Sequence, residues 1–217
     1  MLRTIRLTLA VIFFALITLL FLDFTGTLHA WFGWMAKIQF LPAVLALNIG
    51  VVLFLAVLTL VFGRIYCSVI CPLGVFQDIV SWLSAKRKTR FRYSSALKWL
   101  RYGVLGVFVL AIIGGLNSFV VLLAPYSSYG RIVSSLFSPL YQWANNGLAY
   151  LAERADSYAF YETDVWMKSL PTLLIATVTL VVLIVLAWRG GRTYCNTICP
   201  VGTVLGFLSK YSLLKPV

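Results

Sequence analysis

The sequence predicts an all-α integral membrane protein, in which four transmembrane helices form two repeats of two helices with the same orientation. The first observation behind this prediction is composition: of 217 residues, 61% are hydrophobic and only 11% are charged, and the mean hydropathy is +0.95. Soluble domains contain roughly 25% charged residues. The other observations are an uneven distribution of basic residues and a motif that occurs twice. A soluble fold of this size could not bury so much apolar surface, so lipid is the expected solvent.

Four apolar segments are long enough to cross a membrane. The hydrocarbon core of a bilayer is about 30 Å thick, and a helix needs about 20 residues to cross it. The first segment could be read as a signal peptide, but its apolar stretch is long for one and no Ala-x-Ala cleavage pattern follows it. We therefore expect a retained anchor. The four predicted spans are residues 4–24, 41–63, 103–123 and 170–188.

The basic residues predict the orientation of these spans. With the N-terminus inside, 14 of the 18 Lys and Arg residues fall on the inner side, which is the asymmetry expected for cytoplasmic loops. We therefore predict a multi-pass protein of the bacterial inner (cytoplasmic) membrane with both termini in the cytoplasm. The inner basic residues are Arg3, Arg6, Arg64, Lys86, Arg87, Lys88, Arg90, Arg92, Lys98, Arg101, Arg189, Arg192, Lys210 and Lys215.

The net charge of +12 raises the question of nucleic-acid binding. The densest basic run, residues 86–92, lies directly between two predicted spans. A basic loop in that position contacts the anionic headgroups of membrane lipid. We expect lipid as a partner and no nucleic acid.

One motif occurs twice, 128 residues apart. The first copy reads Gly-Arg-Ile-Tyr-Cys-Ser-Val-Ile-Cys-Pro-Leu-Gly from Gly63, and the second reads Gly-Arg-Thr-Tyr-Cys-Asn-Thr-Ile-Cys-Pro-Val-Gly from Gly191. A repeat of two spans returns the chain to its starting side, so the halves, residues 1–102 and 103–217, would be related by a pseudo-two-fold axis along the membrane normal. Both motifs would then meet near that axis at equal depth.

Each Cys-x-x-x-Cys-Pro sequence is followed by apolar residues at helical spacing, which predicts a short helix in the membrane interface. A second amphipathic helix is expected over residues 136–154, within the long outer loop 124–169. The aromatic residues of that loop fit an interfacial belt. The alternative is that Tyr141, Trp143 or Tyr150 binds a quinone.

All four cysteines, Cys67, Cys71, Cys195 and Cys199, lie in the two motifs. Residues four apart in a helix share a face, so each motif is expected to present two thiols in one direction, and the two pairs to converge into one four-sulfur site. Amide groups at the start of the helix after each proline would lower the pKa of a thiol. The motif glycines permit close backbone approach, and the motif arginines either offset the charge of a cluster or extend to lipid headgroups.

Four thiolates suit either an iron–sulfur cluster or a tetrahedral zinc ion. Structural disulfides are disfavoured on the cytoplasmic side. Haem attachment would need a Cys-x-x-Cys-His sequence, and the single histidine, His29, is expected on the opposite face of the membrane. The spans contain no pair of residues that could act as general acid and general base, so the sequence does not indicate a hydrolase.

The doubled Gly-Arg-x-Tyr-Cys-x-x-x-Cys-Pro-x-Gly motif resembles the membrane module of the NapH/NosR/CcoG-type 4Fe-4S binding proteins. The resemblance implies that the four cysteines are the functional residues, with an iron–sulfur cluster as cofactor, 4Fe-4S favoured, and with a role in electron transfer between quinol, ferredoxin-like clusters and partner reductases, or in copper reduction. Relatives usually continue into a cytoplasmic domain with two further cluster motifs. We expect those clusters either in a longer form of this chain or in a redox partner.

Three functions remain open from the sequence. The leading hypothesis is a membrane-bound iron–sulfur electron-transfer protein, an oxidoreductase component of quinol dehydrogenase or metal reductase type. A metal-free carrier would instead exchange electrons between the two cysteine pairs as thiols and disulfides. A third hypothesis is a non-catalytic protein that anchors or assembles a redox complex.

Overall fold

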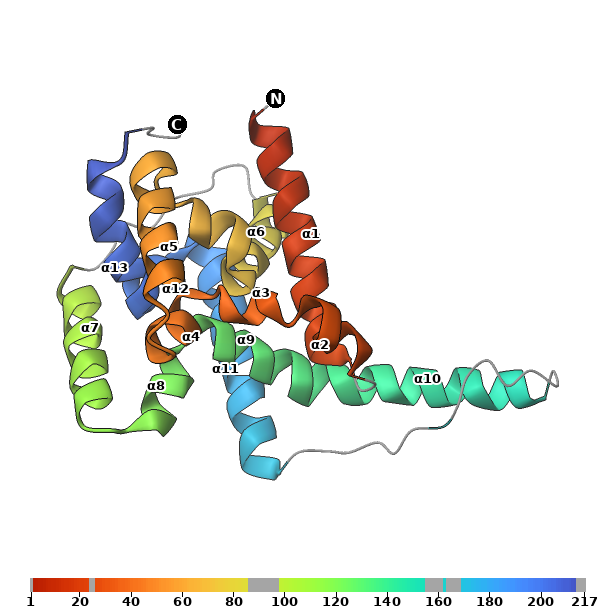
Figure 1. The fold of residues 1–217 in the computed structure, drawn as a ribbon. Helices are drawn as coiled ribbons and strands as arrows, with labels where there is room; N and C mark the ends of the chain where they lie inside the picture. Colours follow the sequence, from red (N-terminus) through yellow and green to blue (C-terminus); the bar gives the residue numbers. More distant parts are fainter. Residues whose placement is uncertain (1, 24–25, 86–97, 155–161, 163–168, 214–217) are drawn as a thin grey trace.

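The computed structural model describes residues 2–23, 26–85, 98–154, 162 and 169–213. Within these residues every regular element is a helix, so the all-α prediction is confirmed (Figure 1). The basic run 86–92 lies outside the described residues. The first half contains α1 (Leu2–Leu22), α2 (Thr27–Phe32), α3 (Trp34–Lys37), α4 (Phe40–Leu45), α5 (Ile49–Phe62), the π-helix η1 (Tyr66–Ile70) and α6 (Pro72–Ala85). The second contains α7 (Lys98–Ile113), α8 (Asn117–Leu123), α9 (Pro125–Ile132), the π-helix η2 (Val133–Phe137), α10 (Ser138–Glu153), α11 (Leu170–Gly190), α12 (Thr193–Thr197), α13 (Pro200–Leu208) and the 3-10 helix η3 (Ser209–Tyr211).

Two helices in the described part of the chain are long and apolar enough to cross a membrane. They cover Thr4–Leu22 and Leu170–Gly190 and agree with the first and fourth predicted spans. Both expose large apolar side chains, including Leu7 at 66% and Leu174 at 65%. Such exposure is consistent with helices that cross a membrane, because a water-soluble helix would cover this face with protein.

The second predicted span, residues 41–63, is not one helix. Leu47 has a φ of 52°, in the left-handed region, and the side chain of Asn48 accepts a hydrogen bond from the backbone N–H of Val51 at 3.4 Å. These two residues end α4 and start α5. The 14 residues of α5 rise about 21 Å, less than the thickness of a bilayer core of about 30 Å.

The third predicted span, residues 103–123, is also broken. After α7 the chain turns at Gly115, whose φ is 70°. The N–H of Leu116 bonds to the carbonyl of Ala111 at 2.9 Å, which is the pattern of a helix closed by a left-handed glycine. Helix α8 then packs back against α7 (Figure 1). The four-span topology therefore stays a prediction.

The start of α1 and the end of α13 lie at one end of the molecule, whereas α10 runs crosswise beyond the other end of α1, and the start of α11 reaches further still (Figure 1). This arrangement agrees with the prediction of a helix over residues 136–154. It also places the first and last helical residues of the described chain on a common side.

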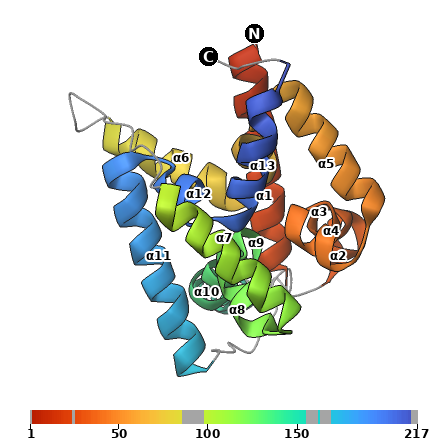
Figure 2. The same ribbon diagram turned by 90° about the vertical axis from the view of Figure 1, so that its left-hand side faces the viewer.

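The two halves pack into each other. Helix α6, which follows the first motif, packs against α11 of the second half, and α13, which follows the second motif, packs against α5 of the first (Figure 2). A short helix after each motif is thus confirmed. The first turn of each helix is buried within the protein: Leu73 is 0% exposed and Val201 is 3% exposed. Its placement in the membrane interface stays a prediction. The boundary between residues 102 and 103 stays a prediction.

Candidate metal centre

The four predicted site cysteines are buried, and all four thiols are free. Their exposed fractions lie between 3% and 7%. The first cysteine of each pair lies in a helix, Cys67 in η1 and Cys195 in α12. The second of each pair, Cys71 or Cys199, stands immediately before α6 or α13.

The second cysteine of each pair ends the helical turn that contains the first. The expectation that each motif presents its two thiols in one direction stays a prediction. Cys71 has a ψ of 114° and Cys199 a ψ of 117°, both extended, because the residue before a proline avoids the helical region. A wide turn ends the helix that contains the first cysteine. In each motif the N–H of the second cysteine bonds to the carbonyl of the tyrosine five residues earlier, Tyr66 or Tyr194, at 2.9 Å.

The close approach predicted for the motif glycines is confirmed. A Cβ on Gly74 would collide with the carbonyl oxygen of Cys67, and a Cβ on Gly202 would collide with that of Cys195. Each glycine therefore lets the helix after the motif pack directly on the backbone of the first cysteine. The same contact in both copies indicates that the repeat is structural as well as sequential.

The amide groups at the start of α6 and α13 point at the second cysteines. The N–H of Gly202 donates to the Sγ of Cys199 at 3.3 Å, and the N–H of Gly74 acts on Cys71 in the same way. These bonds lower the thiol pKa as predicted, but burial outweighs them and raises the pKa of Cys71 to about 12. The unliganded thiol is therefore neutral, and a bound metal would have to displace its proton.

The two cysteine pairs lie close enough to affect each other electrostatically. Burial is the main cause that raises the pKa of Cys195, followed by the charges of Cys199, Cys67 and Cys71. Among the described residues, however, no three His, Cys, Asp or Glu side chains are grouped to hold a single metal ion. The pairs are thus neighbours without forming a one-ion shell.

The side chain of each motif arginine bonds to a residue of the opposite half. Arg64 donates to the Oδ1 of Asn196 in the second motif at 2.8 Å, and Arg192 donates to the Oδ1 of Asp78 in the first half at 2.6 Å. Both guanidinium groups face a cavity of about 80 Å³ between the motifs. This cavity is lined by Arg64, Cys67, Arg192, Cys195, Asn196 and Gly202.

Two buried glutamines hold the motifs in place, and the sequence reasoning missed both. Gln39 accepts from the hydroxyl of Tyr66 at 2.9 Å and donates to the carbonyl of Ile70 at 3.2 Å. Gln77 donates to the Sγ of Cys195 at 3.2 Å. Both side chains are 0% exposed. An amide side chain within an apolar stretch was the available signal, since a polar group there requires a partner.

The aromatic residues considered for quinone binding lie apart from this centre. Tyr141, Trp143 and Tyr150 are on α10 with exposed fractions of 47%, 74% and 53%, and they line neither the cavity between the motifs nor a second, apolar one beside α7. Their exposure agrees with an interfacial belt.

The donor set fits an iron–sulfur cluster. Such clusters take thiolate ligands, and hydrogen bonds to sulfur together with exclusion of solvent set their potentials. Here four buried thiols come with amide donors to sulfur and with two guanidinium groups that can balance anionic charge.

Comparison with known proteins gives the same chemistry. Residues 44–90 and 170–216 each match the 4Fe-4S binding domain. The ferredoxin-type protein NapH of Haemophilus influenzae is 28% identical over 166 residues, which cover 76% of this chain and 44% of that protein. The chain thus spans less than half the length of this relative. No solved structure matches this chain.

Proposed function

We propose that this chain holds one iron–sulfur cluster jointly between its two motifs. Each half matches a 4Fe-4S binding domain, and the chain is similar to a NapH ferredoxin-type protein, which supports an iron–sulfur electron-transfer protein. The ligands would be Cys67, Cys71, Cys195 and Cys199. The observation that carries this proposal is the burial of four free thiols from two repeats within electrostatic range of one another.

The arrangement favours a cluster over a zinc ion. Zinc–sulfur bonds of about 2.3 Å hold the sulfurs of a tetrahedral site within about 4 Å of one another. The described residues contain no such compact group. A four-iron cluster is larger than a single ion and separates its thiolates further, which suits two neighbouring pairs.

The residues of the chain would prepare the site for electron transfer. When bound, the cluster would supply a one-electron redox centre. Gln77 and the amide of Gly202 would donate to its cysteine sulfurs. Arg64 and Arg192 would offset its negative charge from the cavity between the motifs, and the helices packed around the cysteines would exclude water.

The finer assignment of route is also part of the proposal. We place the protein in the bacterial inner membrane with both ends cytoplasmic, where it would pass electrons between quinol and ferredoxin-like clusters. Those clusters would belong to a redox partner or to a longer form of the chain. The likeness to a ferredoxin-type protein supports the partner, and the two long apolar helices support a membrane location.

Anaerobic purification of the full chain, followed by iron and acid-labile sulfide analysis and paramagnetic resonance, tests the proposal. One joint site predicts that Cys71→Ser and Cys199→Ser each remove most of the iron, because one lost thiolate degrades a four-ligand site. Ser81→Ala, on α6 but outside the motif, should retain it.

Two results would count against the joint cluster. Loss of half the iron in each cysteine variant would indicate two independent pairs. Absence of iron and sulfide, with reversible oxidation of the four thiols, would favour the thiol–disulfide carrier.

A further inference from the structure

The two repeats differ at one position beside the motif arginines. Asp78 lies six residues after Pro72, and the residue six after Pro200 is Gly206. In the first half the Asp78 carboxylate binds Arg192. The equivalent of Arg192 is Arg64 of the first motif, and in the second half the position that matches Asp78 is Gly206. The repeat therefore provides an acid for one arginine and leaves the matching place beside the other without one.

Two guanidinium groups, and not one, border this place. A Cβ on Gly206 would lie 3.0 Å from the Nη2 of Arg64 and would collide with the Nη2 of Arg101. Arg101 donates to the carbonyl of Thr203 at 3.0 Å, and its Nε is buried without a hydrogen-bond partner. In the described part of the chain neither arginine has a carboxylate partner.

This juxtaposition is electrostatically unfavourable as it stands. Burial and the charge of Arg64 lower the pKa of Arg101. Among the residues that the structure describes, Arg64 bonds only to neutral groups, the Asn196 amide at 2.8 Å and the Ser209 hydroxyl at 3.3 Å. An anion between the two guanidinium groups would relieve the repulsion and supply the missing acceptors, as Asp78 does for Arg192.

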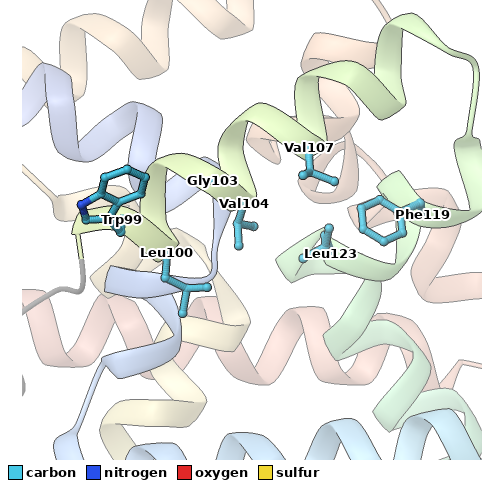
Figure 3. A pocket seen from close by; sticks show the side chains of 7 residues that line it. All are labelled: Trp99, Leu100, Gly103, Val104, Val107, Phe119 and Leu123. Carbon is cyan, nitrogen blue, oxygen red and sulfur yellow. The ribbon is translucent and has the colours of Figure 1, made fainter.

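The surface around the arginine pair is apolar. Trp99 is 95% exposed, Leu100 46% and Phe207 54%. From the first turn of α7 a groove of about 580 Å³ runs between α7 and α8 with almost entirely apolar walls (Figure 3). The residues that line it are Trp99, Leu100, Gly103, Val104, Val107, Phe119 and Leu123. Arg101 lies in the same first turn of α7 as Trp99 and Leu100, which line the groove. A cationic pair beside an apolar groove matches the two parts of a phospholipid.

We propose that Arg64 and Arg101 bind the phosphate group of an anionic phospholipid at Gly206, with an acyl chain of the same lipid in the groove between α7 and α8. The site contains none of the four cysteines and does not rest on the proposed function, although it shares Arg64 with the cavity between the motifs. It would fix one lipid molecule at the contact between the two halves, where α13 meets α5 and α7.

The test measures phosphatidylglycerol bound to the delipidated full chain in detergent by native mass spectrometry. Arg101→Gln should weaken binding at least tenfold, because it removes the charge-assisted hydrogen bonds of one guanidinium group. Gly206→Asp should weaken it at least as much, since it restores the carboxylate of the other repeat. Arg189→Gln, which removes an exposed charge on α11, should retain most binding.

Three results would overturn the assignment. Unchanged phosphatidylglycerol binding in Gly206→Asp and Arg101→Gln would remove the lipid from this place. Full competition by inorganic phosphate at equal concentration would indicate a site for the free anion. If these two variants keep their lipid binding but no longer associate with a redox partner, the arginine pair would instead dock an acidic protein segment. Helical circular dichroism of each variant establishes that it has folded.

Discussion

Arg192 in the second motif binds Asp78 in the first half, with its Nε 2.6 Å from the carboxylate Oδ1. The two residues are 114 positions apart in the sequence, so this ion pair joins the halves directly beside the cysteines. The side chains are 25% and 41% exposed, which limits the strength of the pair through screening by solvent.

Replacing this acid should weaken the contact between the halves. In Asp78→Asn, Arg192 keeps a hydrogen-bond acceptor but loses the charge that offsets its burial. We expect a loss of about 1 kcal/mol in unfolding free energy, near the upper range for partly exposed pairs, measured by thermal unfolding in detergent. Glu153→Gln, an exposed acid at the end of α10, is the control, and an equal loss in both variants would mean that net charge alone matters.

The second prediction concerns Gln77, whose amide donates to the Sγ of Cys195. Leu205 occupies the equivalent position in the second repeat, so Gln77→Leu makes the repeats alike. A hydrogen bond to sulfur stabilises the reduced, more negative state of a cluster. If this hydrogen bond contributes about 1 kcal/mol, its loss in Gln77→Leu should lower the reduction potential of the cluster by roughly 40 mV for one electron.

Redox titration of the loaded protein measures this change. Gln142→Leu, which removes a similar amide from α10, should leave the potential unchanged. A potential in Gln77→Leu equal to that of the unaltered protein would mean that this hydrogen bond does not reach the redox centre.

The third prediction concerns the motif glycines. Gly202→Ala would push a methyl group into the carbonyl oxygen of Cys195, a backbone atom that cannot rotate away. We expect this variant to lose several kcal/mol of stability, within the range of strained core changes, and most of its iron. The matched control is Gly147→Ala on α10, where a Cβ meets nothing within 4 Å. That change should stabilise the helix by about 0.5–1 kcal/mol. Equal iron content in the two variants would contradict the close packing at the motif.

The fourth prediction is the membrane topology. Reporter fusions after Ser84 and after Asn146 should lie on opposite sides, with Ser84 in the cytoplasm. The reason is the 14-to-4 division of basic residues. A result that places both on one side would mean that the interrupted segment α7–α8 does not cross the membrane.

Local signals in the sequence were sufficient for part of this structure. The duplicated motif identified all four buried cysteines, and the glycines in it indicated the close contact of helix and backbone because no other residue fits there. Each proline marked the start of α6 or α13, since it cannot continue a helix but suits its first turn.

Features that depend on partners distant in the sequence were not predictable in this way. The interruptions at Leu47 and Gly115 fall inside continuous apolar runs, where hydropathy does not distinguish a span from two shorter helices. The burial of the first turns of α6 and α13 follows from packing against the opposite half. The role of Gln77 also depends on packing between the halves, because its partner Cys195 lies in the other half of the chain.

The exchange of helices between the halves imposes an order on biosynthesis. Helix α6 leaves the ribosome with Gln77 and Asp78 in place, but its packing surface, α11, is made roughly ten seconds later at ordinary rates of elongation. Until then the first half has neither the cation for its carboxylate nor the sulfur for its amide. Cofactor insertion would therefore have to wait for the last helices, and a chain stalled before α11 would expose an unsatisfied polar face that quality-control proteases can recognise.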